Sequence, residues 1–446
     1  MENKFSKKLN IVRGVKLWNR AKKLIPGGTQ LLSKRSEMFL PDGWPSYYAK
    51  VKGVNVWDLD GNRYIDMSLM GVGSCILGYA DPDVNRAVKR AIDAGSMNTL
   101  NSPEDVELAE VLLGLHPWAG MARFARSGGE AMAVAVRIAR AHTGKDTVAI
   151  CGYHGWSDWY LAANLAEKKS LDGHLLPGLD PAGVPRGLRG TAFTFSYNRI
   201  DELKKLTNAH PDIGVIVVEP FRHQEPAKDF LREVKKIAQK IGAVLIFDEI
   251  TIAWRMNAGG VHLRYGVNPD IAVFAKAMSN GYPMAAIIGK REVMQAAQKT
   301  FISSTYWTER VGPAAALATI RKIKSRNVPA HLHAIGNSIG EGWKKLLDAH
   351  GLKAHILGPP SLITLSWDYG PRTQAVRTLF TQEMLKRGFL ASASVYVSYA
   401  HTEAHVRRYL RAVDEVFGLL AYAIANRNVN SLLKGPAAHS GFRRLT

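Results

Sequence analysis

Short runs of aliphatic residues alternate with amphipathic stretches through the middle of the chain. The runs that we expect to form buried strands are residues 147–151, 213–218, 243–247, 271–275 and 285–289. Apolar residues recur at helical spacing before the first of these runs, over 104–115 and 130–142, and again between two of them, over 229–241. Buried strands that alternate with such helices are typical of a mainly parallel sheet covered on both faces. The pattern predicts an α/β fold for this part of the chain.

Both ends of the chain show a different pattern. Near the start, apolar residues at helical spacing over 17–25 end at Pro26-Gly27-Gly28. A predicted hairpin follows, with strands 54–57 and 64–67 around an Asp-Gly-Asn turn. After about residue 330, helices are expected at 331–350, 373–387 and 403–425, with strands at 362–367 and 395–398. We predict an N-terminal segment over 1–75, a large domain over 76–328 and a C-terminal α+β domain over 329–446.

Composition narrows the class of protein. The chain has 446 residues, 46% of them hydrophobic, so it can bury a sizeable core. Its two cysteines, Cys75 and Cys151, cannot form a disulfide framework. The basic start lacks the apolar stretch of a signal peptide, and no apolar run is long enough to cross a bilayer. We expect a cytoplasmic protein with no membrane partner.

The charge is strongly positive. The formal net charge is +21, and residues 1–35 contain ten Lys or Arg and one acid. One interpretation is a solvated basic surface. The other is attraction of an anionic partner, such as phosphate, a nucleotide-linked substrate or nucleic acid. Because no recognised nucleic-acid motif accompanies the charge, an anionic small molecule is favoured.

Two candidate site motifs lie beside the first predicted elements of the large domain. Ser127-Gly128-Gly129 opens the helix predicted from residue 130. Glycines before a helix let the backbone approach a phosphate, whereas the alternative is a tight turn with Ser127 as N-cap. Tyr153 and His154 follow strand 147–151, where an aromatic ring can stack on a planar ligand or simply belong to an ordinary loop.

Two further candidates follow the next strands. Asp248 follows the apolar run 243–247, at the rim expected for a ligand crevice, where a carboxylate could bind metal, ribose or a protonated ring nitrogen. Lys276 follows strand 271–275. Burial at such a place lowers the pKa of an amine and increases its nucleophilic neutral form, whereas the alternative is a snorkelling surface lysine.

Together these strand ends offer an anion cradle, a stacking aromatic, a carboxylate and an amine. Pyridoxal 5'-phosphate (PLP) requires these four kinds of partner. The carboxylate would keep the pyridine nitrogen protonated, so that the ring withdraws electrons from the substrate carbon. Lys276, once released, would move the proton at that carbon.

The chain also resembles class III aminotransferases of PLP fold type I, and most of all the glutamate-1-semialdehyde 2,1-aminomutase group. The matching segments span almost the full length: IPGG (25–28), VWDLDGNRYIDM (56–67), RSGGEA (126–131), GYHGWSD (152–158), VEP (218–220), LIFDEI (245–250), FAKAMSNGYP (274–283) and HSGFRRL (439–445). This resemblance implies a large domain with a mainly parallel seven-stranded sheet, which binds PLP, and a smaller α+β domain built from both termini.

The resemblance also implies roles for individual residues. Lys276 resembles the Schiff-base lysine, Asp248 the partner of the pyridine nitrogen, and Tyr153 the stacking aromatic. The other implied cofactor contacts are an apolar contact below the ring, the phosphate loop, a glutamate of open role, and a threonine from the second subunit of a homodimer: Ile250, Ser127, Gly128, Gly129, Glu219 and Thr305.

Departures from the family pattern concern the phosphate and the substrate. Gly129 stands where the family usually has Thr, so one hydroxyl contact to the phosphate is missing. The segment 306–310 is bulkier than in the aminomutases, and 221–224 is unusual. Candidate contacts to an anionic substrate are Lys34, Arg35, Arg222 and Arg310.

We therefore expect a PLP-dependent aminotransferase that acts on a small amino donor and an anionic carbonyl acceptor. The alternative is an intramolecular aminomutase of the glutamate-1-semialdehyde type. A third possibility is a non-catalytic protein that uses the basic N-terminal segment to bind an anionic polymer. The complete catalytic set argues against this possibility.

His401 and His405 have a spacing that could bind metal, but Thr402 suits an N-cap and no third ligand is evident, so we expect no metal site.

Overall fold

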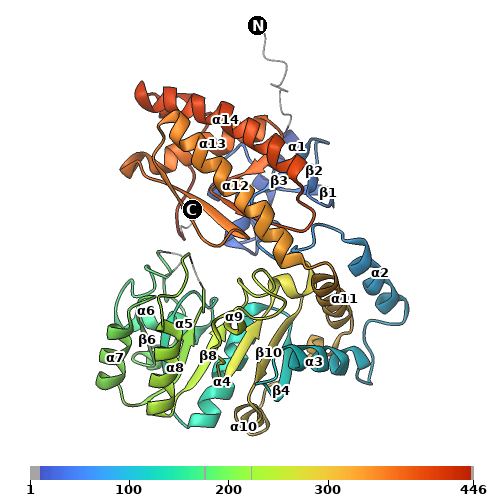
Figure 1. Cartoon of the computed structure of the whole chain (residues 1–446), viewed down its shortest axis with the longest axis vertical. Helices are drawn as coiled ribbons and strands as arrows, with labels where there is room; N and C mark the ends of the chain where they lie inside the picture. The colour runs from blue at the N-terminus through green and yellow to red at the C-terminus, as the bar shows by residue number, and fades with distance from the viewer. Residues whose placement is uncertain (1–10, 175–176, 222, 443–446) are drawn as a thin grey trace. The chain divides into compact units, whose positions relative to one another are not determined.

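The computed structural model describes residues 11–174, 177–221 and 223–442 (Figure 1). These residues divide into two compact units. The larger unit is Pro82–Pro329, and the smaller one joins the chain up to Asp81 with the chain from Ala330 onward. Each unit has its own sheets.

The larger unit is built on a seven-stranded sheet with the order β4-β10-β9-β8-β7-β5-β6. All neighbouring strands pair in parallel except β10, which is antiparallel to both β4 and β9. The strands are β4 (Met121–Ala125), β5 (Thr147–Cys151), β6 (Ala192–Thr194), β7 (Ile213–Val218), β8 (Val244–Asp248), β9 (Ile271–Phe274) and β10 (Ala285–Gly289). The expected mainly parallel, seven-stranded α/β fold is confirmed.

Aliphatic side chains on both faces of this sheet explain why its strands read as unbroken apolar runs. On β7, Val215 and Val217 belong to one hydrophobic cluster, whereas Ile216 and Val218 belong to the other. Helix α4 (Gly128–Thr143) supplies much of the first cluster, and α8 (Phe230–Ile241) supplies much of the second. The other helices of this unit are α2 (Pro82–Asp93), α3 (Pro103–Leu115), α5 (Asp158–Leu161), α6 (Ala163–Ala166), α7 (Ile200–Ala209), α9 (His262–Tyr265), α10 (Arg291–Met294) and α11 (Val311–Ser325).

Two strands of the large sheet were missed by the sequence patterns. Strand β4 carries Arg123 and is only partly buried, so it does not read as an apolar run. Strand β6 has only three residues. Both are recognisable through their pairing with neighbouring strands, which is a tertiary property.

The smaller unit combines both ends of the chain. Its four-stranded sheet has the order β1-β2-β3-β13, in which C-terminal β13 (Phe389–Ala391) pairs in parallel with N-terminal β3 (Arg63–Met67). The remaining strands are β1 (Tyr48–Lys52), β2 (Asn55–Asp58) and a separate antiparallel sheet of β11 (Ala354–Leu357), β12 (Leu362–Trp367) and β14 (Ser394–Tyr396). Strands β1, β11 and β13 were not predicted.

Helices complete the smaller unit. The predicted N-terminal helix is α1 (Val12–Leu24), and it buries Trp18, whose indole donates a 3.0 Å hydrogen bond to Glu37. The others are α12 (Val328–His350), α13 (Thr373–Lys386), α14 (Glu403–Ala425) and α15 (Val429–Leu432). Thr402 caps α14 as expected, accepting a hydrogen bond from the amide of His405. A smaller α+β domain from both termini is confirmed. None of the described helices is long and apolar enough to span a membrane.

Candidate active site

The candidate residues of the larger unit gather at one edge of its sheet. Strands β4, β5, β7, β8 and β9 run in the same direction, so their carboxyl ends meet at that edge. These ends lead into Ser127, Tyr153, Glu219, Asp248 and Lys276. Parallel pairing therefore brings together side chains that are up to 149 positions apart.

Lys276 lies just beyond β9, as the first residue of a short 3-10 helix, η4 (Lys276–Ser279). Its φ of 44° lies in the left-handed region, which costs free energy for a residue with a side chain. The Lys276 amine donates a 2.8 Å hydrogen bond to the hydroxyl of Thr251. Burial lowers the pKa of this amine, although Asp248 and Glu219 oppose the shift. The expected effect of burial on this lysine is confirmed in direction.

Asp248 is the last residue of β8, and its side chain is almost fully buried. One oxygen accepts a 3.0 Å hydrogen bond from the Ile250 amide, and the other lies 2.8 Å from Nδ1 of buried His154. The carboxylate can only accept, so Nδ1 of His154 carries the proton of this bond. Nε2 of His154 is buried and has no hydrogen-bond partner within the described residues. His154 therefore orients Asp248, a contact that the sequence did not reveal.

Tyr153 and Glu219 are joined through the backbone. The Tyr153 amide donates a 3.0 Å hydrogen bond to the Glu219 carboxylate. Gly152, directly before Tyr153, has a φ of 130°. A Cβ at this residue would lie 2.7 Å from that same carboxylate oxygen. Burial raises the pKa of the Tyr153 hydroxyl, so the phenol stays neutral at ordinary pH. Only glycine at 152 lets Glu219 hold the start of the Tyr153 loop.

Ser127 caps helix α4 in a complete capping box with Glu130. The Glu130 carboxylate accepts hydrogen bonds of 2.8 Å from the Ser127 amide and 3.0 Å from its hydroxyl. The N-cap interpretation is thus correct for the side chain. The following amides, of Gly128 and Gly129, are in the first turn of α4 and have no acceptor within the helix. Such amides at a helix N-terminus favour an anion, so the two interpretations are compatible.

The two glycines are closely covered by other parts of the site. A Cβ at Gly128 would lie 2.9 Å from Ile250, directly after the Asp248 strand. A Cβ at Gly129 would lie 3.1 Å from the indole nitrogen of Trp156, whose side chain is 72% exposed. The space of a side chain at 129 is therefore occupied by the Trp156 N–H. This contact was not predicted, because it joins two loops.

Arg126 is a second residue whose role the sequence did not indicate. Its guanidinium donates hydrogen bonds of 3.1 Å and 2.7 Å to the carbonyl oxygens of Trp307 and Glu309. It also pairs with the Glu309 carboxylate at 2.8 Å. Arg126 thereby ties the short 3-10 helix η6 (Thr305–Thr308) to the loop that begins at Ser127. Thr305 itself is exposed.

The candidate substrate residues have different surroundings. Arg310 pairs with Glu104 at 2.5 Å, so its charge is neutralised within the larger unit. Lys34 and Arg35 belong to the smaller unit, where Lys34 ends a 3-10 helix and Arg35 lies 5.8 Å over the ring of Phe442. Arg222 lies outside the described residues.

The two histidines considered for metal have other partners. Nε2 of His401 lies 2.9 Å from the carbonyl oxygen of Asp66, and Nδ1 lies 3.0 Å from the Ser398 amide. Nδ1 of His405 receives the Thr402 amide at 3.1 Å. A search of the described residues finds no group of three or more potential ligands that could hold a metal ion.

The residues of the sheet edge fit PLP in chemical character. The narrow glycine cradle with free helix amides suits a phosphate, and the buried Asp248 suits a protonated ring nitrogen. The buried Lys276 amine, with its lowered pKa, suits a bond to an aldehyde.

Known proteins resemble this chain over most of its length. A family model described as class III aminotransferase matches residues 42–388. The 3-aminobutyryl-CoA aminotransferase of Cloacimonas acidaminovorans (strain Evry) is 31% identical over 423 residues, which cover 92% of this chain and 98% of that protein. The 2'-deamino-2'-hydroxyneamine transaminase of Streptomyces kanamyceticus is 29% identical, covering 84% of this chain and 92% of its own.

Solved structures agree with these relatives. The FumI protein of Sphingopyxis sp. MTA144, solved in its PLP internal aldimine form, superimposes with a TM-score of 0.84 at 27% identity, covering 94% of this chain and 99% of its own. A glutamate-1-semialdehyde aminomutase from Pseudomonas aeruginosa PAO1 has a TM-score of 0.77 at 20% identity, covering 92% and 94%. At that identity the aminomutase supports the fold alone.

The lowered pKa of Lys276 predicts a pH dependence of stability. In the unfolded chain the amine regains its ordinary pKa of 10.5, so between the two values the unfolded state binds more protons. The free energy of unfolding of the cofactor-free protein should therefore rise with pH over the interval below the ordinary pKa of 10.5 and level off above it. Urea unfolding of Lys276→Met should lack this component of the rise. Lys290→Met, which removes an amine paired with Asp270 at 2.8 Å, is the control. Equal pH slopes for wild type and Lys276→Met would contradict the assigned burial.

Proposed function

Starting from the fact that the chain belongs to the class III aminotransferase family and uses PLP, we propose that it moves an amino group from a small donor to an anionic keto or aldehyde acceptor. The observation that carries the proposal is the buried Lys276 amine at the same sheet edge as Asp248. Aminotransferase relatives over more than nine-tenths of the chain support the reaction class.

We assign each cofactor contact to residues of this sheet edge. Lys276 is the Schiff-base lysine, Asp248 pairs with the pyridine nitrogen, and Tyr153 stacks on the ring. Ile250 packs below the ring, and Glu219 holds the Tyr153 loop. Ser127, Gly128 and Gly129 form the phosphate loop.

PLP supplies a carbonyl that joins the donor amine and a ring that withdraws electrons from the donor carbon. The chain supplies the proton handling. Because burial lowers the pKa of Lys276, a larger fraction of its Nζ is neutral and able to accept a proton from the donor carbon and later return it. His154 keeps Asp248 oriented, and the buried carboxylate keeps its partner nitrogen protonated.

An anionic acceptor is the finer part of the proposal. The formal net charge of +21 supports it, as does the Cloacimonas relative, whose name specifies an acyl group on coenzyme A, an anionic compound. Among the candidate contacts, Lys34 and Arg35 remain proposals, as does Arg222. Arg310 is the weakest of the four, because Glu104 already neutralises it. The aminomutase alternative has less support, since that structure is only 20% identical.

We also propose a homodimer with shared active sites. In the larger unit, the strongly exposed large hydrophobic side chains among described residues all lie in a few segments. They are Ile92, Leu100, Val106, Trp156, Phe301 and Tyr306. Contiguous exposed apolar side chains mark interaction surfaces, and two of this set, Phe301 and Tyr306, flank Thr305 in the sequence, the proposed phosphate contact across the dimer. A cytoplasmic location remains part of the proposal.

Gly129 and Trp156 suggest how the missing threonine hydroxyl is replaced. We propose that the Trp156 indole N–H donates to the cofactor phosphate, because it occupies the side-chain space of residue 129. The indole can only donate, which suits an anion.

Replacing Lys276 tests the reaction class. Borohydride should fix PLP to the wild-type chain at the peptide that contains Lys276, and Lys276→Ala should abolish both this adduct and transfer of ¹⁵N from donor to acceptor. Lys290→Ala is a matched control, because Lys290 also follows a buried strand but lies at the opposite edge, since β10 is antiparallel. An undiminished adduct in Lys276→Ala would refute the assignment. Turnover without any separate acceptor would favour the aminomutase.

A matched pair of acceptors tests the preference for anions. Enzyme first incubated with an amino donor should react with 3-oxobutyryl-CoA at a kcat/KM at least about tenfold above that of the neutral methyl ester of 3-oxobutyrate, the effect of one charge-assisted contact. Keto-sugars and semialdehydes, with and without phosphate, extend the comparison. Equal values for charged and neutral members of every pair would exclude the anionic acceptor.

A double-mutant cycle tests the pair of residues 129 and 156. Trp156→Phe should weaken PLP binding about tenfold, because a hydrogen bond to a charged group is lost. Gly129→Thr alone should also weaken binding, because its side chain meets the indole. In a Trp156→Ala background the same Gly129→Thr change should instead strengthen binding, since the hydroxyl is restored. Equilibrium dialysis of PLP measures each constant, and an unchanged sign of the Gly129→Thr effect would disprove the exchange.

A further inference from the structure

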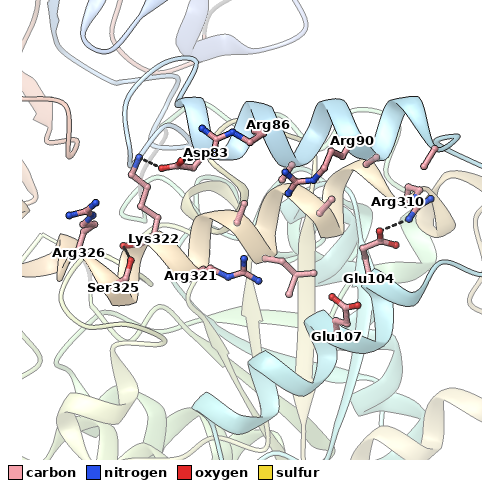
Figure 2. A pocket seen from close by; sticks show the side chains of 16 residues that line it. Asp83, Arg86, Arg90, Glu104, Glu107, Arg310, Arg321, Lys322, Ser325 and Arg326 are labelled. Carbon is pink, nitrogen blue, oxygen red and sulfur yellow. Dashed lines mark hydrogen bonds and ion pairs between the residues drawn. The ribbon is translucent and has the colours of Figure 1, made fainter.

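A charged groove lies on the larger unit, lined by helices α2, α3 and α11 (Figure 2). Its volume is about 600 Å³, within the size range of small-molecule sites. Six of its lining residues are basic and three are acidic, so it carries an excess of three positive charges. The basic residues are Arg86, Arg90, Arg310, Arg321, Lys322 and Arg326.

Ion pairs neutralise the two ends of the groove but not its middle. Lys322 pairs with Asp83 at 2.7 Å, and Arg86 pairs with the same carboxylate at 3.4 Å. Arg310 pairs with Glu104. Within the described residues, the guanidinium groups of Arg90 and Arg321 have no hydrogen bond or ion pair. Figure 2 shows both reaching into the space between α2 and α11. Like charges that line one groove repel one another, so an anion between them would be stabilised.

The groove owes its depth to alanines. The residues that line it between the arginines include Ala87 and Ala91 on α2, and Ala314 and Ala318 on α11. Small side chains leave room between the helices, and the longer arginine side chains extend into it. The result is a concave site with guanidinium groups on two facing helices, rather than a convex basic surface.

Helix α11 separates this groove from the candidate active site. Its buried face, which includes Ala315, Thr319 and Ile320, is distinct from the face that lines the groove. The helix also packs against η4, the segment that begins at Lys276. An α-helix with its side chains is about 10 Å across, so the part of a ligand that sits in the groove does not itself touch Lys276.

We propose that the groove binds a diphosphate group, as carried by a nucleotide, with Arg90 and Arg321 as its principal ligands and Arg86 beside them. The planar fork of arginine matches phosphate oxygens with two parallel hydrogen bonds, and two facing arginines match two linked phosphates. The same chemistry could come from a free nucleotide or from the nucleotide end of a coenzyme A substrate. The binding itself does not depend on the proposed acceptor.

Direct binding to the holoenzyme tests the site. Calorimetric titration with pyrophosphate, ADP and coenzyme A should give saturable binding that weakens as KCl is raised. Arg90→Glu and Arg321→Glu should each weaken it at least about tenfold, and Arg321→Lys by less, because the charge stays while the fork is lost. Arg411→Glu, a change at an exposed arginine in the middle of α14, is the matched control and should have no effect.

The two possible sources of the diphosphate predict different kinetic effects of Arg321→Glu. If the ligand is the substrate, Arg321→Glu should raise KM for a coenzyme A acceptor and leave kcat and the KM of an uncharged acceptor unchanged. If the ligand is a free nucleotide, both KM values stay the same while ADP binding is lost. Either result supports the site, and both can be read even if the anionic acceptor proves wrong, because titration with pyrophosphate needs no turnover.

Several outcomes would overturn the proposal. These are an absence of pyrophosphate binding, equal binding of sulfate, and equal weakening by Arg411→Glu. Displacement of pyrophosphate by duplex DNA at matched phosphate concentration would assign the charge to nucleic acid instead. A change from dimer to monomer in Arg321→Glu would assign the groove to a subunit interface. Arg321→Gln, which adds no negative charge, repeats each measurement should Arg321→Glu alter the circular dichroism spectrum.

Discussion

The buried amine of Lys276 is the constraint on which the rest of the site depends. Removing an amine from water costs free energy, and this cost appears here as a lowered pKa. The Thr251 hydroxyl satisfies the amine, and the opposite charges of Asp248 and Glu219 partly offset the burial. The left-handed backbone at Lys276 adds strain that only a well-packed surrounding can maintain. The parallel strands β8 and β9 provide that surrounding, because they deliver the amine and the carboxylate to one edge.

Residues that follow different strands of the sheet hold one another in place at this edge. Asp248 is oriented by His154, which follows β5, and the Tyr153 loop is held by Glu219, which follows β7. Arg126, which follows β4, holds the segment around Thr305. The loops at the strand ends are therefore linked by hydrogen bonds, so that a substitution in one loop can displace the side chain that another loop holds. This bracing explains the glycine at 152, because a Cβ there would lie 2.7 Å from the Glu219 carboxylate that holds the Tyr153 loop.

The sequence predicted the features that depend on local pattern. Apolar runs such as 213–218 and 243–247 identified the central strands, and the cap of α4 at Ser127 was evident from its neighbours. Lys276 and Asp248 could be found because they end such strands. Strands β4 and β6 could not be found, because their stability comes from pairing rather than composition. The contacts of Arg126 and Trp156 could not be predicted from the sequence either, because each joins two segments that only the folded sheet brings together.

The arginines that can bind an anion are also identified by the folded structure rather than by the sequence. Counted along the chain, Arg310 was a candidate for an anionic substrate, whereas Arg90 and Arg321 drew no attention. In the folded larger unit Glu104 neutralises Arg310, while Arg90 and Arg321 line the same groove with no ion pair among the described residues. A positive charge is available to a ligand only where the fold keeps acidic side chains away from it. The excess charge of the sequence therefore has functional meaning chiefly at the few guanidinium groups that folding leaves unpaired.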